Sequence, residues 1–472
     1  MKTIMSYRLK AKIIAHDSFH TIKKTKYTMK KIIYTLLIAA SVVSAKPAMA
    51  QGKAYEMMVN GVKVIVQPSG NDIVEIQTIL KGGVHNYPAD KMGIEALAMT
   101  ALTECGTVRH DKNAFKDALD RVSASVYGSS GKDYSILGMN CIKSDLDVVW
   151  PLYNEALTQP RFDTTEFARI KDDAINNLKQ RESSPDAAID KMANEAAFAG
   201  RDFAKDPEGT PEIISKLTAA ETKAYYNSIL TRSRMLVVVV ADLDRNVIEQ
   251  KVGQMLAGIK LGKPVGLQKT FFRVYNNSFK SEQRELATNY VEGVTSGPEV
   301  DAPDYIAFSV AMRIFAQRHF LDIRTNNGLS YAPQAWFSNG STTSARFSVS
   351  TTMPDKYIAV FDKLVDSTKK HGFTAAELAD MKITYLTGFY YKNETNAAQA
   401  SSIAANEVLR GDWKHSLNLV QDVKKVSLAD INTAFSKYIG NIVWVYQGDT
   451  KKVNPKLYIN GTLGTGDNPV TN

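Results

Sequence analysis

Residues 74–88 read VEIQTILKGGVHNYP and residues 93–107 read GIEALAMTALTECGT, and the fold is decided in these two stretches. Within the first, EIQTIL alternates enough between apolar and polar side chains to predict a strand, as VKVIVQ does at 62–67. The short apolar run Val237–Val240 is typical of a buried strand. The first half therefore reads as strand, strand, helix, further strands, a helical block and a final strand.

The stretch 93–107, with the strand before it, resembles the opening of the M16 metallopeptidases, the family of insulinase, pitrilysin and the mitochondrial processing peptidase. There the corresponding helix reads approximately G-x-x-H-x-x-E-H and ends in G-T. Counting forward from Gly93 places Ala96 and Thr100 at the histidine positions and Met99 at the glutamate position. Counting back from Gly106 and Thr107 places Leu97 and Ala101 at the histidine positions and Thr100 at the glutamate position. Neither register supplies a zinc ligand.

The third metal ligand of active relatives is also missing. The family carries a glutamate roughly eighty residues after the first histidine, and the matching stretch here, AINNLKQRESSPD, places Asn177 or Asn176 there. Asparagine is a poor zinc ligand compared with a carboxylate. The histidines offer no substitute, since no two of them are spaced i, i+3 or i, i+4 among His85, His110, His319, His371 and His415. We therefore expect no metal site in this chain.

The sequence repeats itself once, at an offset of about 210 residues. Residues 164–203 and 374–413 share a T-x-x-E-like start, two long helical runs, an A-N-E triplet and an exit with Arg, Gly and an aromatic residue. Residues 217–242 and 426–449 then match as a helix followed by an apolar strand. The repeat predicts two tandem homologous α+β domains, each of which the resemblance makes a mostly antiparallel sheet covered by helices.

The predicted boundaries follow from this repeat. We expect a leader at 1–50, a first domain at 51–260, a Gly- and Lys-rich linker at 261–284, a second domain at 285–460 and a polar tail at 461–472, with fraying from Asn454 onward. Thr164 and Thr374 are expected to cap their helices, with Glu166 and Glu377 completing capping boxes.

The first fifty residues predict secretion. A basic start at Met29-Lys30-Lys31 precedes the apolar run IIYTLLIAASVV, and Ala48-Met49-Ala50 suits a signal peptidase. An uncleaved anchor is the alternative, but the run is short for a membrane span. Of 58 basic and 49 acidic residues, ten and one lie in residues 1–50, which leaves 48 of each. The mature chain thus offers no basic field for nucleic acid or a membrane surface, and we expect it in the periplasm.

The segment DIRTNNGLSYAPQAW at 322–336 resembles the family's I-R-x-x-x-G-L-x-Y motif, with Arg324 and Tyr331 seven residues apart. In paired M16 proteins one chain carries the zinc helix, and the partner carries this arginine and tyrosine. The resemblance implies that they hold the substrate backbone and stabilise the oxyanion, which suits a guanidinium fork and a phenolic donor. The alternative is that Arg324 pairs with Asp322 and Tyr331 packs in a strand. A departure from the family is RIFAQRHF where a glycine-rich turn is usual.

Peptides in the family add as an extra strand to an edge of the first domain. The equivalent segment here is VYGSSGKDYS, which makes Tyr127, Gly128 and Ser129 candidate substrate-binding residues. A plain hairpin is the alternative, and GSSGK lacks the spacing of a phosphate loop. Cys105 and Cys141 are expected to be buried free thiols rather than a disulfide, and their spacing fits no metal site.

These observations predict a pseudoenzyme, inactive alone, that forms a heterodimer with a homologous zinc-bearing subunit. Zinc is expected in the partner only, the substrate is a peptide, and neither nucleic acid nor membrane is a partner. A peptide-binding or structural assembly subunit without catalytic contribution, like the core subunits of respiratory complexes with this fold, is the alternative.

Overall fold

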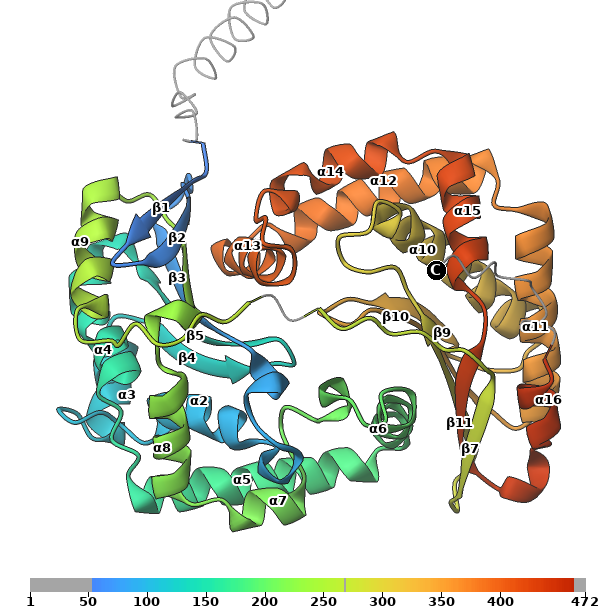
Figure 1. Cartoon of the computed structure of the whole chain (residues 1–472), viewed down its shortest axis with the longest axis horizontal. Helices are drawn as coiled ribbons and strands as arrows, with labels where there is room; N and C mark the ends of the chain where they lie inside the picture. Colours follow the sequence, from blue (N-terminus) through green and yellow to red (C-terminus); the bar gives the residue numbers. More distant parts are fainter. Residues whose placement is uncertain (1–52, 267–268, 462–472) are drawn as a thin grey trace, which may run out of the picture. The chain divides into compact units, whose positions relative to one another are not determined.

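The structure is a computed structural model that describes residues 53–266 and 269–461, which belong to one compact unit. The leader expected at 1–50 and nearly all of the tail expected at 461–472 lie outside the described residues. The described chain contains two sheets and the helices that cover them (Figure 1).

The first sheet has six strands in the order β1-β2-β6-β3-β5-β4. All neighbouring strands pair antiparallel except β2 and β6, which are parallel. Its strands are β1 (Tyr55–Val59), β2 (Val62–Gln67), β3 (Ile73–Lys81), β4 (Ser125–Ser130), β5 (Tyr134–Ile142) and β6 (Met235–Val240). The helices of this half are α2 (Ile94–Glu104), α3 (Lys112–Asp120), α4 (Leu146–Thr158), α5 (Thr164–Ser183), α6 (Pro185–Ala197), α7 (Pro211–Lys216), α8 (Ala219–Ile229) and α9 (Arg245–Leu256).

The second sheet has five strands in the order β7-β11-β8-β10-β9, and here β7 and β11 form the parallel pair. Its strands are β7 (Ser278–Gln283), β8 (Asn289–Ser296), β9 (Gln334–Ser338), β10 (Ser344–Thr351) and β11 (Ile442–Gly448). The helices of this half are α10 (Tyr305–Phe320), the π-helical turn η6 (Leu321–Asn326), α11 (Pro354–His371), α12 (Ala375–Lys392), α13 (Asn396–Arg410), α14 (His415–Lys425), α15 (Leu428–Tyr438) and α16 (Pro455–Ile459).

The two sheets share one topology. Without β1, the first sheet runs β2-β6-β3-β5-β4, which matches β7-β11-β8-β10-β9 strand for strand and places the parallel pair at the same edge. The prediction of two tandem α+β domains with mostly antiparallel sheets is therefore confirmed. The exact domain boundaries remain a prediction, but β7 lies inside the stretch expected to be linker and belongs to the second sheet.

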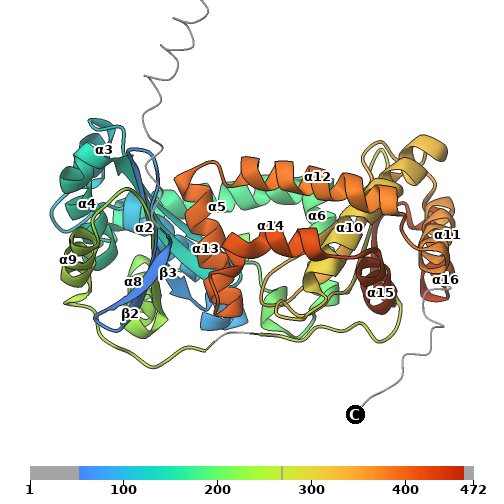
Figure 2. The same cartoon turned by 90° about the horizontal axis from the view of Figure 1, so that it is seen from above.

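One helix of each half packs against the sheet of the other half. Helix α6 packs on β8 and β11, and helix α13 packs on β3 and β6. Figure 1 shows α6 beside the second sheet, and Figure 2 shows α13 over β3. Ile403 of α13 is buried with Ile79 and Val238, while Ile189 of α6 is buried with Val294 and Val445. These two helices occupy matching places in the sequence repeat, so the exchange is reciprocal.

Two expectations need correction, one about a helix cap and one about the C-terminal segment. Asp163, not Thr164, caps α5, because its carboxylate accepts from the backbone N–H groups of Thr165 and Glu166. Thr374 caps α12 as expected, and Glu377 completes the capping box. The chain does not fray at Asn454, since Asn454 caps α16 and Tyr458 is buried behind it.

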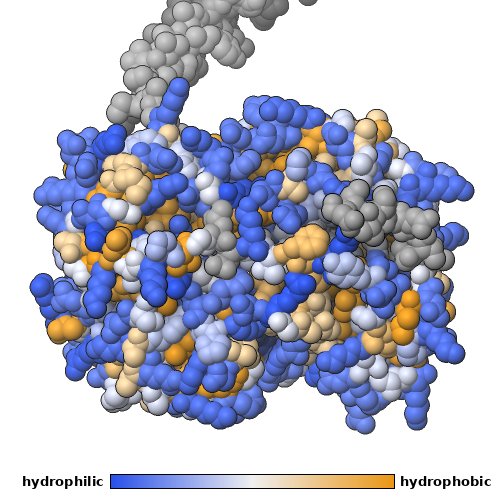
Figure 3. Space-filling model, in the orientation of Figure 1, coloured by the Kyte–Doolittle hydropathy of each residue, from blue (hydrophilic) through white to orange (hydrophobic). Residues whose placement is uncertain are grey.

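The helices of the described residues give no sign of a membrane crossing, since none of them is both long and apolar enough. On the face drawn in Figure 3, apolar residues lie in small patches separated by hydrophilic ones.

Candidate functional site

Helix α2 is the counterpart of the zinc helix, and its burial decides between the two registers. Leu97 and Ala101 are buried in the core of the first half, whereas Ala96 and Thr100 are half-buried and lie one turn apart. The Thr100 hydroxyl donates back to the Ala96 carbonyl at 2.9 Å, as threonine often does within a helix. Burial therefore favours the forward register from Gly93 for the two histidine positions, which hold Ala96 and Thr100, while Met99 at its glutamate position is buried.

Zinc does not fit these residues. Asn176 and Asn177 are exposed on α5, and across the described residues no group of three His, Cys, Asp or Glu side chains is arranged to hold a metal ion. Among the histidines, the His85 ring contacts Asp202 and the His110 ring contacts Glu155, so neither is available to a metal at α2. Burial lowers the pKa of His319 to about 3.

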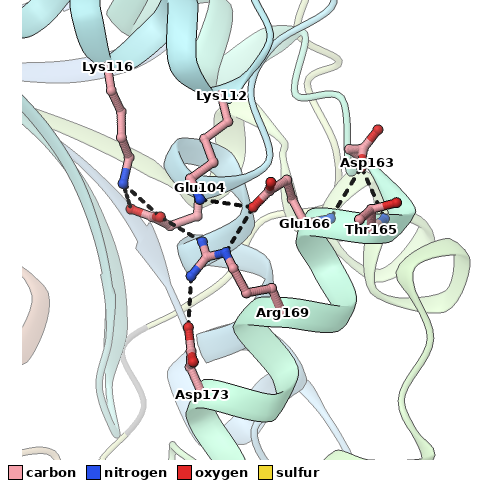
Figure 4. A network of polar contacts seen from close by, with 8 residues as sticks. All are labelled: Glu104, Lys112, Lys116, Asp163, Thr165, Glu166, Arg169 and Asp173. Carbon is pink, nitrogen blue, oxygen red and sulfur yellow. Dashed lines mark hydrogen bonds and ion pairs between the residues drawn. The ribbon is translucent and has the colours of Figure 1, made fainter.

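An ion-pair network fastens α2 to α5 close to this position (Figure 4). Arg169 of α5 donates to Glu104 of α2 at 3.0 Å, to Glu166 at 2.8 Å and to Asp173 at 2.7 Å. Two lysines of α3 extend the network, since Lys116 pairs with Glu104 and Lys112 pairs with Glu166. Hydrogen bonds from Arg169, then from Lys112, lower the pKa of Glu166. The charged side chains of this network therefore hold helices together, and the network offers no catalytic group.

We expect the purified mature chain to hold no stoichiometric zinc and to cleave no peptide. The reason is that every position of the zinc motif carries a side chain that does not bind zinc. Metal analysis after dialysis, with a peptidase assay on the same sample, checks this. About one tightly held zinc per chain would contradict it.

The register assignment predicts an asymmetry between two double variants. Ala96→His/Thr100→His should be tolerated, because both side chains reach solvent. Leu97→His/Ala101→His should lower the free energy of unfolding by about 2 kcal/mol or more, because it buries polar rings in the core. Urea unfolding of both variants measures the difference. Equal stability would argue for the other register.

The candidate peptide-binding residues lie on β4, at the free edge of the first sheet. Gly128 faces α2 so closely that a Cβ there would lie 2.2 Å from the Met99 carbonyl oxygen, so this position needs glycine. Tyr127 points to the opposite face, where its hydroxyl donates to Glu75 at 2.6 Å and accepts from Gln77. Ser129 is exposed. β4 also forms a hairpin with β5. The segment is therefore both a plain hairpin and an edge strand, and the two alternatives given for it do not exclude each other.

Arg324 and Tyr331 form a stacked pair in the second half. The Arg324 guanidinium lies 4.1 Å from the centre of the Tyr331 ring and 5.1 Å from that of Phe320. Tyr331 is 78% exposed and lies before β9 rather than in a strand. No ion pair of Arg324 occurs among the described residues, and Asp322 instead accepts from the side chain of Asn326.

The structure thus brings Tyr127, Gly128 and Ser129 together and brings Arg324 and Tyr331 together, but no contact joins the two groups. Cys105 and Cys141 are buried free thiols, as expected, and burial raises their pKa values to about 12 and about 11.

The sequence analysis missed a buried ion pair at the centre of the described chain. Arg346 of β10 lies 2.7 Å from Glu292 of β8, and both are almost fully buried. Burial is the main cause that raises the pKa of Glu292 to about 7. The signal was present, since each strand carries one charged residue among small or apolar ones, NYVEGVTS and SARFSVST.

Comparisons with known proteins agree with this geometry. Residues 216–385 match the family described as the peptidase M16 inactive domain. The "Non-peptidase homolog YmxG" of Helicobacter pylori is 22% identical over 420 residues, which cover 86% of this chain and 94% of that protein. Cytochrome b-c1 complex subunit 1 of Caenorhabditis elegans is 20% identical, over 85% of this chain and 89% of its own.

Two solved structures show the same fold. The peptidase M16 inactive domain from Pseudomonas fluorescens superposes with a TM-score of 0.78 at 18% identity, over 86% of this chain and all of that one. The periplasmic protease PqqL from Escherichia coli gives a TM-score of 0.73 at 16% identity, over 86% of this chain and 47% of its own.

Proposed function

We propose, from the premise that this chain is an M16 family homologue without zinc ligands, that it is the non-catalytic subunit of a periplasmic heterodimeric zinc peptidase. In this proposal a homologous partner carries the zinc and the H-x-x-E-H helix. Arg324 and Tyr331 of this chain complete the partner's active site for peptide hydrolysis.

The observation that carries the proposal is the stack of half-buried Arg324 on exposed Tyr331. Among the described residues the Arg324 guanidinium has no carboxylate partner, so its hydrogen-bond donors are available to another molecule. Stacking on the Tyr331 ring fixes the orientation of the guanidinium, and exposed Tyr331 adds a hydroxyl from the same segment. A guanidinium and a phenol hydroxyl can donate hydrogen bonds to a peptide carbonyl and to the oxyanion that develops on hydrolysis. The chain's own α2 offers nothing for them to assist.

Peptide binding by this chain is proposed along β4. Strand addition relies on backbone groups, so the free edge at Tyr127, Gly128 and Ser129 supplies the affinity without particular side chains. The close approach of Gly128 to α2 keeps that strand pressed against the helix.

Secretion is part of the proposal, with cleavage after Ala50. It is supported by the basic, apolar and small-residue segments of 29–50, and the similar PqqL is described as periplasmic. Mass spectrometry of the chain from a periplasmic extract tests it, since a mature protein that begins at Gln51 is expected. An intact leader in a membrane fraction would argue for an anchor.

Affinity purification of the tagged chain from its native envelope tests the assembly. A zinc-containing M16 chain with an intact H-x-x-E-H should copurify and show peptidase activity only when both chains are present. Recovery in a complex without any such chain would favour the alternative.

The alternative is a peptide-binding or structural assembly subunit with no catalytic contribution. It is favoured by the similarity over 85% of this chain to a subunit described as part of the cytochrome b-c1 complex. The two proposals differ in whether Arg324 and Tyr331 affect catalysis.

A further inference from the structure

The edge strand β4 ends at a cavity of about 410 Å³, a volume at the lower end of the range for small-ligand sites. Ser129 and Ser130 of β4 line it, together with Lys132 and Asp133 of the following turn. Arg346 of β10 contributes from the second sheet. A molecule bound along the free edge of β4 therefore reaches this cavity at the carboxyl end of the strand.

Lys132 is a half-buried cation that makes no ion pair with a carboxylate among the described residues. Its ammonium donates to the side-chain oxygen of Asn194 at 3.1 Å and to the backbone carbonyl of Phe203, and it lies 4.5 Å above the Phe203 ring. None of the described ion pairs includes it. An ammonium has three N–H donors, so one remains for a ligand.

Arg346 is the second cation of the cavity wall. It is only 7% exposed, and one terminal nitrogen makes its ion pairs with Glu292 at 2.7 Å and with Asp190 at 3.1 Å. Its Nε is buried and has no hydrogen-bond partner. A buried donor without a partner is costly, so this nitrogen is poised to receive an acceptor.

Lys132 and Arg346 lie close enough in the cavity wall to repel each other. Burial is the main cause that lowers the pKa of Lys132 to about 8; the negative charge of Asp206 opposes this lowering, the positive charge of Arg346 adds to it, and Asp190 and Asp133 also oppose it. Asp133 is already engaged, because both of its oxygens accept from the Ser341 backbone N–H, and burial raises its pKa. A carboxylate between the two cations would accept from both and relieve their repulsion.

We infer that this cavity binds the C-terminal carboxylate of a peptide that lies parallel to β4 as an added strand. A strand parallel to β4 ends at Ser130, next to the cavity, whereas an antiparallel one would place its amino end there. The inference rests on the proposed peptide binding along β4, and it gives that binding a direction and a preference for free peptide ends. Lys132 and Arg346 act as the carboxylate receptors, and the backbone of β4 holds the residues before the terminus.

The test measures binding of a random eight-residue peptide pool to the mature full-length chain by fluorescence anisotropy. The peptides carry fluorescein on the amino terminus and end in either a free acid or an amide. The acid pool should bind about tenfold more tightly or better, because only the free carboxylate forms charge-assisted hydrogen bonds with the two cations. This comparison requires no mutation, so it does not depend on the folding of a variant.

Two lysine variants localise the effect. Lys132→Met should reduce the preference for the acid to about twofold or less. Lys280→Met removes the same charge from an exposed residue of β7 that lines the larger neighbouring cavity but not this one, and it should leave the preference unchanged.

Equal affinity for acid and amide would overturn the inference and leave strand addition along β4 intact. A pool with a free amino end and an amidated carboxyl end that binds more tightly than the acid pool would overturn it too. If no peptide binds in any form, both the inference and the proposed role of β4 fail. The role of Arg324 and Tyr331 is measured separately, by the activity of the two-chain complex.

Discussion

Replacing Arg324 with alanine should lower the kcat of the proposed complex with a zinc-bearing partner by about 10²- to 10³-fold, the loss typical of an oxyanion-hole donor. Within the part of the chain that the structure describes, the side chain stacks between Phe320 and Tyr331 and makes no ion pair. Its removal therefore breaks no ion pair, and the chain should stay folded and assembled. Steady-state kinetics of the reconstituted complex, with size-exclusion chromatography for assembly, measure the effect.

Tyr331→Phe separates the hydroxyl from the ring. The ring still supports the guanidinium at the same position, so Arg324 stays in place and only a donor is lost. If the hydroxyl stabilises the oxyanion, kcat falls while KM changes little. If the pair only positions the substrate backbone, KM rises and kcat stays near its original value.

The second half provides matched controls for both variants. Arg313 of α10 stacks on Tyr385 at 4.7 Å, so Arg313→Ala removes a similar cation–ring contact elsewhere. Tyr391 of α12 is 74% exposed, so Tyr391→Phe removes a comparable hydroxyl. Both should leave kcat and KM unchanged. If the Arg324 and Tyr331 variants also match the wild type within about twofold, the assembly-subunit alternative takes over.

Local patterns predicted much of the fold because their causes are local. VKVIVQ became β2 with the expected ends, since alternation and β-branched residues favour a half-buried strand. Thr374 was recognised as a cap because the glutamate at the third helical position completes the box. The same reasoning failed at Thr164, because Asp163, one residue earlier, competes for the same backbone N–H groups and is the better cap.

Features that depend on distant contacts were beyond the sequence analysis. Two registers of α2 were equally open until burial placed Ala96 and Thr100 on its accessible side. The pairing of Glu292 with Arg346 depends on the register of β8 with β10, which no local pattern encodes. Lys132 follows β4 in GSSGK, and its contacts with Asn194 of α6 and with Phe203 depend on tertiary packing that no local pattern encodes.

The exchanged helices α6 and α13 are the other tertiary feature, and they make the stability of the two halves interdependent. The repeat predicted that the helices correspond, but not that each covers the sheet of the opposite half. Ile403 and Ile189 lie at the centres of these contacts and are 2% and 1% exposed. A substitution at either position therefore affects a contact between one half and the other.

Ile403→Ala and Ile189→Ala should each lower the free energy of unfolding by about 2–5 kcal/mol, because each leaves a cavity against a sheet that cannot close over it. Ile383→Ala is the matched control, since Ile383 of α12 is 66% exposed and its truncation should cost about 0.5 kcal/mol or less. Urea unfolding measures the three values. Because α13 belongs to one half and packs on the other, Ile403→Ala should also reduce hydrogen-exchange protection in both sheets, at β3 and β6 and at β8 and β11. Loss of protection confined to the first sheet and α13 would show that the halves unfold independently and that the exchanged helices do not couple them.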